Sequence, residues 1–276
     1  MAAVLSLTAV GLSLVFGTMR VVNVAHGEFF MLGAVIAWFV TYYMGGPDWL
    51  RFVAAMVVAP VAVGALAICA DRLVLRRLNY EPEATIVATI GLLYILQQAA
   101  LELFGPDARP VVPPFTLRLQ LPWFGYSGYK IFVVVAAIVI LLGVWAFISR
   151  TKAGLVMRAT QIDRDTARAF GIDTDRVYAL VFGLGAALAA LGAVLIVPIQ
   201  QAHYLMGGDP LLLAFIVVII GGLGSLRGTL VAALIIGLSD GVISMFFTPT
   251  LAKILATLLV ALVLVFRPQG LFGAKA

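Results

Sequence analysis

Five polar residues stand inside stretches of sequence that are otherwise almost entirely apolar. They are Asn23, His26, Glu28, Gln97 and Asp240. A polar or ionisable side chain in apolar surroundings costs free energy unless it finds a partner, a proton or water. In membrane proteins such side chains often face a solute or ion pathway. We therefore consider these five residues as candidates for the lining of a translocation pathway.

Each of these residues also has a purely structural explanation. Asn23 and His26 can satisfy backbone groups at a junction between helices. Glu28 can lie in the first turn of the next helix, where the helix dipole favours an acid. Gln97 fits a hydrogen bond between neighbouring helices better than it fits a pathway. Asp240 can bond a neighbouring helix or lie close to the membrane interface.

Other kinds of active site find little support in the sequence. The run GGLGSLRGT, residues 221–229, resembles a phosphate-binding loop, but the lysine of that motif is missing and the flanking sequence is apolar. The chain has two histidines, His26 and His203, and one cysteine, Cys69. With so few histidine and cysteine residues, we expect no metal site, no catalytic triad and no intramolecular disulfide. We expect no cofactor and no nucleotide hydrolysis by this chain alone.

The composition indicates that membrane helices position these residues. Of the 276 residues, 63% are hydrophobic and 11% are charged, whereas soluble domains have about 25% charged residues. A helix that crosses a bilayer needs about 20 mainly apolar residues. Uncharged windows occur at 1–19, 29–47, 52–70, 84–101, 131–149, 177–208, 210–226 and 254–266, and Asp240 alone interrupts another at 228–252. We expect one all-α, polytopic transmembrane domain over residues 1–276, with eight or nine membrane segments, of which 210–226 is short, broken or re-entrant.

The basic residues predict the orientation of these segments. Six of the 18 lysines and arginines lie in 150–176, and such an excess marks the cytoplasmic side of a membrane protein. Alternating spans then place 71–83 and the C-terminal tail inside and 105–130 outside. We interpret the net charge of +5 as a sign of this topology and not of a nucleic-acid surface.

The cytoplasmic segment 150–176 has the pattern of a compact helical knob. The sequence predicts a short helix from Arg158 to Phe170, which Gly171 ends in the left-handed conformation. Asp173 or Thr174 is suited to cap the next span. The size and charge of this segment favour a docking site for a soluble partner, and a solvated linker is the alternative.

Five ordered runs resemble the permease subunits of ATP-binding cassette importers for branched-chain amino acids. They are VFGTMRVVNVAHGEFFMLGA, ATIGLLYILQQ with FGPDARPV, GLVMRATQIDRDTARAFGID, IIGGLGSLRGTLVAALIIG and LVFRPQGLFG. The third run resembles the loop that couples such permeases to their ATPases. That loop carries an E-A-A-x-x-x-G pattern, which Asp165-Thr166-Ala167 and Gly171 match in spacing, with Asp in place of Glu and Thr in place of the first Ala. The coupling residues that this implies are Arg158, Arg164, Asp165, Ala167, Arg168 and Gly171.

The resemblance implies a heteromeric importer in the bacterial inner membrane. This chain would work in the lipid bilayer with a second homologous permease subunit, two cytoplasmic ATP-binding subunits and a periplasmic solute-binding protein, and without nucleic acid. Closure of the ATPases would shift the permease between inward- and outward-facing states. Branched-chain amino acids are the expected cargo, with urea or short amides as alternatives within the family. The rival outside the family is an ion-coupled secondary transporter that uses Glu102 or Asp240.

Overall fold

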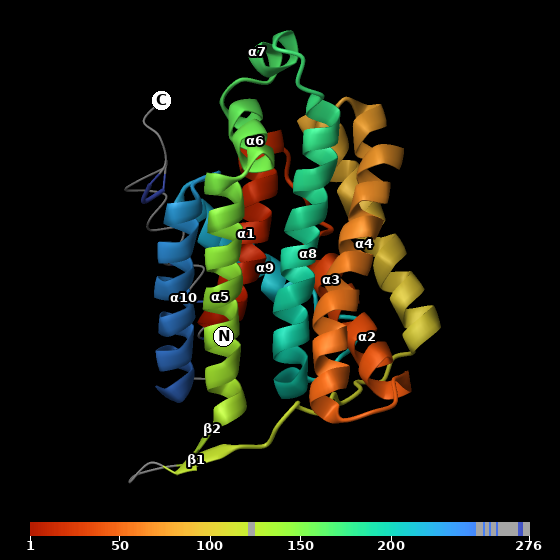
Figure 1. The fold of residues 1–276 in the computed structure, drawn as a ribbon, viewed down its shortest axis with the longest axis vertical. Coiled ribbons are helices and arrows are strands. Elements are labelled where there is room, and N and C mark those ends of the chain that lie inside the picture. The colour runs from red at the N-terminus through yellow and green to blue at the C-terminus, as the bar shows by residue number, and fades with distance from the viewer. Residues whose placement is uncertain (121–124, 247–250, 252–253, 255–257, 259–269, 273–276) are drawn as a thin grey trace.

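A computed structural model describes residues 1–120, 125–246, 251, 254, 258 and 270–272. The elements of this part follow one another in the order shown in Figure 1. They are α1 (Ala2–Met19), α2 (His26–Tyr43), α3 (Asp48–Leu73), the 3-10 helix η1 (Leu75–Leu78), α4 (Pro82–Phe104), β1 (Arg118–Gln120), β2 (Gly125–Ser127), α5 (Gly128–Arg150), α6 (Lys152–Ile162), α7 (Arg164–Ala169), α8 (Thr174–Gln200), α9 (Gly208–Gly221) and α10 (Leu226–Phe246).

The protein is a polytopic helical membrane protein, as its composition predicts. Six of the described helices are long and apolar enough to cross a bilayer, namely α1, α3, α4, α5, α8 and α10. The bundle also contains α2 and the shorter apolar α9, which has 14 residues. Its described helices come close in number to the predicted eight or nine segments, while six of them have the length and composition of a span. The segment 210–226 is indeed short, because α9 ends at Gly221 and α10 begins at Leu226. The predicted segment 254–266 lies largely outside the described residues.

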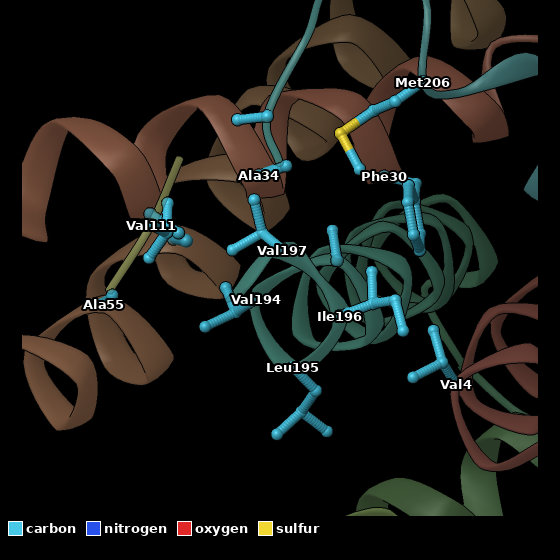
Figure 2. Packing of buried hydrophobic residues seen from close by; sticks show 14 of the residues in the cluster. Val4, Phe30, Ala34, Ala55, Val111, Val194, Leu195, Ile196, Val197 and Met206 are labelled. Carbon is cyan, nitrogen blue, oxygen red and sulfur yellow. The ribbon is translucent and has the colours of Figure 1, made fainter. Parts of the chain in front are cut away.

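Helix α8 lies at the centre of the bundle, and α4 and α5 lie at its edge. In the most apolar 18-residue stretch of α8, 78% of the residues are buried inside the protein. The corresponding share is only 22% in α4 and 17% in α5. Small residues let the helices around α8 approach closely. A Cβ atom on Gly11 of α1 would lie only 2.5 Å from the carbonyl oxygen of Gly185 in α8. Figure 2 shows the end of α8 surrounded by side chains from several elements, with Val4 of α1, Phe30 of α2 and Met206 around Ile196.

The two ends of the bundle differ in character. Helix α7 projects beyond the other helices at one end, and the antiparallel β1–β2 hairpin lies at the opposite end (Figure 1). The basic segment 150–176 contains α6 and α7, so the positive-inside rule predicts that the α7 end faces the cytoplasm. Residues 270–272 lie at that end too, since the N–H groups of Leu271 and Phe272 donate to carbonyl oxygens at the end of α9.

The short helices α2 and α9 begin at the same place in the interior. A Cβ atom on Gly27, the second residue of α2, would lie 2.5 Å from the carbonyl oxygen of Gly207, which precedes α9. Irregular backbone, residues 20–25 and 201–207, leads into each of these helices. Irregular backbone at membrane depth is tolerated where protein covers it, and in membrane transporters interrupted helices commonly surround the solute site.

Candidate functional site

The basic segment 150–176 contains two short helices, α6 and α7, and the prediction of one helix from Arg158 to Phe170 is wrong. The break falls at Asp163, whose carboxylate accepts hydrogen bonds from the N–H groups of Asp165 (2.9 Å) and Thr166 (3.1 Å). Aspartate competes with helix continuation in this way because its side chain caps the start of a new helix. The Thr166 hydroxyl also donates to this carboxylate. The hydrogen bonds from Thr166 hold the pKa of Asp163 below its usual range.

The prediction for Gly171 is confirmed. Its φ is +81°, and two hydrogen bonds close the end of α7 around it. The Gly171 N–H donates to the carbonyl of Arg168, and the Ile172 N–H donates to that of Ala167. This is the Schellman arrangement, in which the left-handed residue is usually glycine. Asp173 caps α8 by accepting from the N–H of Arg176, which settles the choice between Asp173 and Thr174.

The predicted coupling residues divide into an inner and an outer set. Arg158 binds the α5 end, since both its terminal nitrogens lie 3.5 Å from the Ser149 carbonyl oxygen. Arg164 and Arg168 turn inward to the Asp175 carboxylate. Ala167 is buried and Asp165 is exposed. Of the predicted coupling residues, only Asp165 and the Gly171 turn therefore stand clear of such inward contacts.

Three apolar side chains on the outer surface of the segment are exposed to solvent, and none of them is among the predicted coupling residues. Leu155, Ile162 and Phe170 are exposed, and Phe170 is the most exposed at 83%. We call residues 152–171 with these three side chains the α6–α7 projection. Single exposed apolar residues are common on proteins. Three on one short segment, whose helix α7 extends beyond the bundle in Figure 1, are typical of a surface that binds another protein.

Asn23, His26 and Glu28 are brought together at the start of α2, where they are at most 3% exposed. We call this group the polar junction. The Nε2 atom of His26 lies 2.9 Å from the carbonyl oxygen of Thr8 in α1, so the chain after α1 has turned back along that helix. Thr89 of α4 holds the entering segment, because its hydroxyl accepts from the N–H of Val24.

The polar junction satisfies only part of its hydrogen-bonding capacity within the described chain. Asn23 Oδ1, His26 Nδ1 and Glu28 Oε2 are buried and have no hydrogen-bond partner among the described residues. Most buried polar atoms in proteins do have partners. The structural explanation accounts for the Nε2 atom of His26, which binds a backbone carbonyl, and for the position of Glu28 in the first turn of α2. It does not account for the three buried atoms without a partner among the described residues.

A cavity of about 570 Å³ lies beside the junction, between α1, α8, α9 and α10. Its polar lining comes from Thr8, Gln200, His203 and Asp209, and apolar residues such as Phe30 and Leu213 complete it. Thr8 belongs to both features, because its carbonyl oxygen binds His26. Ligand sites in proteins commonly have this size and this mixture of apolar walls with a few polar groups.

The remaining two pathway candidates lie apart from the junction. Gln97 is half-buried on α4, eight residues and so about 12 Å along the helix from Thr89. Its neighbour Gln98 donates to Glu102 (3.0 Å) on an exposed face. Asp240 lies within α10, and its side chain is outside what the structure describes. No group of three or more His, Cys, Asp or Glu side chains in the described residues could hold a metal ion.

The sequence matches a known family over residues 1–265, and the family is described as the permease component of branched-chain amino acid transport systems. The chain belongs to this family. It is 29% identical to the high-affinity branched-chain amino acid permease BraD of Pseudomonas aeruginosa, over 97% of this chain and 91% of that protein. It is 28% identical to LivH of Escherichia coli, with the same coverage, and 26% identical to a probable LivH of Methanocaldococcus jannaschii, over 98% and 88%. No solved structure matches the chain.

Membership of this family decides between the two classes of transporter that the sequence left open. The chain is a transporter permease subunit, and the rival class of ion-coupled secondary transporters is not supported. The galactofuranose transporter permease YtfT of Escherichia coli is also similar, at 30% identity over 54% of this chain. Sugar and amino-acid permeases thus both share sequence features with this chain.

Proposed function

We propose that this chain is the membrane-spanning subunit of an ATP-driven importer that moves branched-chain or related amino acids across the bacterial inner membrane. The observation that carries this proposal is the α6–α7 projection, which has apolar side chains exposed at the cytoplasmic end of a member of this permease family. A subunit without ATPase chemistry of its own needs such a docking surface for an energy source. The proposed partners are a second homologous permease, two cytoplasmic ATP-binding subunits and a periplasmic solute-binding protein.

The proposed pathway passes the polar junction and the adjoining cavity. The unpartnered atoms of Asn23, His26 and Glu28 support this route, and Thr8 connects the junction to the cavity. Asp240 and Gln97 stay candidates for other levels of the same route. The cavity has both polar groups and apolar walls, which suits a charged backbone group joined to an aliphatic side chain. Branched-chain amino acids have this chemistry.

Reconstitution tests the proposed function. The chain is purified with the second permease and the ATP-binding subunits, placed in liposomes, and supplied with binding protein and radiolabelled leucine. We expect leucine uptake that requires both ATP and the binding protein, and that unlabelled isoleucine or valine reduces more than urea does. Uptake by the chain alone, driven by an ion gradient without ATP, would contradict the proposal.

Replacing Gly171 with valine should weaken the attachment of the ATP-binding subunits. The residue has φ +81° and no heavy atom within 4 Å of an added Cβ, so the penalty comes from the backbone alone, at about 1–2 kcal/mol. This is too little to unfold the bundle, but it distorts the end of α7. We expect several-fold less ATPase in a pull-down and weaker stimulation of ATP hydrolysis by the binding protein.

Asparagine provides a matched control at this position, because it tolerates the left-handed conformation better than valine does. Gly171→Asn should retain most of the pull-down and stimulation. Equal behaviour of wild type, Gly171→Val and Gly171→Asn would mean that the end of α7 plays no part in coupling.

A further inference from the structure

One carboxylate connects α7 to the turn between α3 and α4. Asp175, in the first turn of α8, is 2.9 Å from the NH2 atom of Arg168 and 3.6 Å from that of Arg164, both in α7. The same carboxylate accepts from the Nε atom of Arg76 in η1 at 3.2 Å. The Asp175 side chain is 23% exposed, so the three cations are arranged around a largely shielded acid. Elements more than 85 residues apart in sequence thus meet at this acid.

Two aromatic rings reinforce the connection. The Arg164 guanidinium lies over the rings of Tyr80 and Tyr178, at 5.4 Å and 4.9 Å from their centroids. Tyr80 follows η1 and packs edge to face on Tyr178 of α8, with centroids 4.7 Å apart. Burial, and then the nearby Asp71 carboxylate, raise the pKa of the Tyr80 hydroxyl. This hydroxyl is therefore a neutral donor, and it lies 3.5 Å from Asp71 Oδ2 in α3.

Helix α7 has few other attachments in the described chain. Asp163, Asp165 and Thr166 bond one another, and Arg168 also donates to Thr174 at the start of α8. Beyond its chain neighbours α6 and α8, α7 contacts Tyr80 through the Arg164 guanidinium. Its ion pairs go to Asp175 of α8, and Asp175 in turn pairs with Arg76 of η1. A force applied to α7 can therefore reach the α3–α4 hairpin through Asp175 and the two tyrosines, in addition to the packing of α8 on α3 at Gly183 and Gly64.

We propose that Asp175, with Arg76, Arg164 and Arg168, forms a charged joint that transmits movement of α7 to the α3–α4 hairpin. The proposal rests on the proposed function, since it needs an ATPase to move α7. Without the joint, α7 would act on α3 only through α8, which follows α7 in the chain and packs on α3. Asp175 is a positioning residue in this proposal, because it acts on helices and not on the solute. The partners Arg76 and Arg168 are 57% and 48% exposed, and ion pairs that water reaches stabilise proteins little. The joint can therefore be broken without unfolding the bundle.

The test is Asp175→Asn in the complete transporter, with uptake and ATP hydrolysis measured in the same liposomes. Asparagine keeps the size of the side chain but removes the charge that attracts three arginines. We expect unchanged copurification of the ATP-binding subunits and continued hydrolysis, with uptake per ATP hydrolysed lower by about fivefold, at the lower end of ordinary coupling between sites. Asp173→Asn is the matched control, because Asp173 pairs only with Arg176 in this region. It should leave the ratio unchanged.

A second variant breaks the joint from the other side. Arg76→Gln removes the η1 cation, whose side chain is 57% exposed, so folding should not depend on it. It should lower uptake per ATP as Asp175→Asn does, and the double variant should be no worse than either single one. An unchanged ratio in Arg76→Gln would overturn the proposal, and so would loss of ATPase copurification in Asp175→Asn, which would make the cluster part of the docking surface. Failure of the proposed function would differ, because the wild-type complex would then show no ATP-dependent uptake.

Discussion

Replacing Gly27 with alanine should destabilise the bundle by about 3 kcal/mol, at the upper end of the usual cost of overpacking. The added Cβ would lie 2.5 Å from the Gly207 carbonyl oxygen and 2.9 Å from Leu211 Cβ. Gly207 makes a reciprocal close approach to the backbone of Gly27. Because the first obstacle is backbone and not the end of a flexible side chain, the starts of α2 and α9 have to separate.

Gly91→Ala is the control, since Gly91 also lies within a helix, α4, but has no heavy atom within 4 Å of an added Cβ. Alanine favours a helix interior by up to about 1 kcal/mol over glycine. Thermal unfolding in detergent should therefore show a lower midpoint and a smaller monodisperse yield for Gly27→Ala, and an unchanged or higher midpoint for Gly91→Ala. Equal midpoints in Gly27→Ala and wild type would mean that the two helices do not meet as described.

The long spans were predictable because their signal is local. Runs of uncharged residues locate α3, α4, α5 and α8 from the sequence alone, and the arginine-rich segment indicates which end is cytoplasmic. The end of α7 was predictable for the same reason. A left-handed residue after a helix favours glycine, and Gly171 needs no distant partner to adopt φ +81°.

The sequence alone does not decide whether the helix breaks at Asp163. Aspartate can lie on the exposed face of a helix or cap a new one, and the hydroxyl of Thr166 three residues later favours the cap. The joint at Asp175 could not be predicted, because Arg76 is 99 residues away. The sequence indicates only that an acid lies in the first turn of α8, where the helix dipole explains it without any partner.

The sequence predicted which residues form the polar junction but not how the helices around it are arranged. The pattern singled out Asn23, His26 and Glu28 as expensive residues in apolar sequence, and the structure places all three at the buried start of α2. The sequence pattern did not indicate that α9 begins at the same point as α2, because Gly27 and Gly207 are far apart in the chain. The cavity residues His203 and Asp209 were not among the predicted pathway residues, since they lie at the end of an apolar window, where polar residues ordinarily mark a membrane interface.

Replacing Phe170 with aspartate should remove most of the affinity for the ATP-binding subunits. Phe170 is 83% exposed at the end of α7, so it contributes little to the packing of the bundle. A large aromatic side chain on a docking surface typically becomes a centre of binding energy once a partner covers it, and its truncation costs about 2 kcal/mol or more. A carboxylate would in addition have to lose its water in an apolar contact. We expect at least a 30-fold weaker association, since about 1.4 kcal/mol corresponds to tenfold.

The measurement is the affinity of purified ATP-binding subunits for permease that is immobilised in detergent, by pull-down over a concentration series. Phe170→Tyr keeps the ring and should bind nearly as wild type does. Val112→Asp introduces the same charge at another exposed apolar residue, 57% exposed, which lies between α4 and β1 in a segment predicted to be outside the membrane. It should leave the association unchanged because the ATP-binding subunits act in the cytoplasm. Equal weakening by Phe170→Asp and Val112→Asp would point to general damage of the permease, whereas wild-type affinity in Phe170→Asp would show that the partner binds elsewhere than the α6–α7 projection.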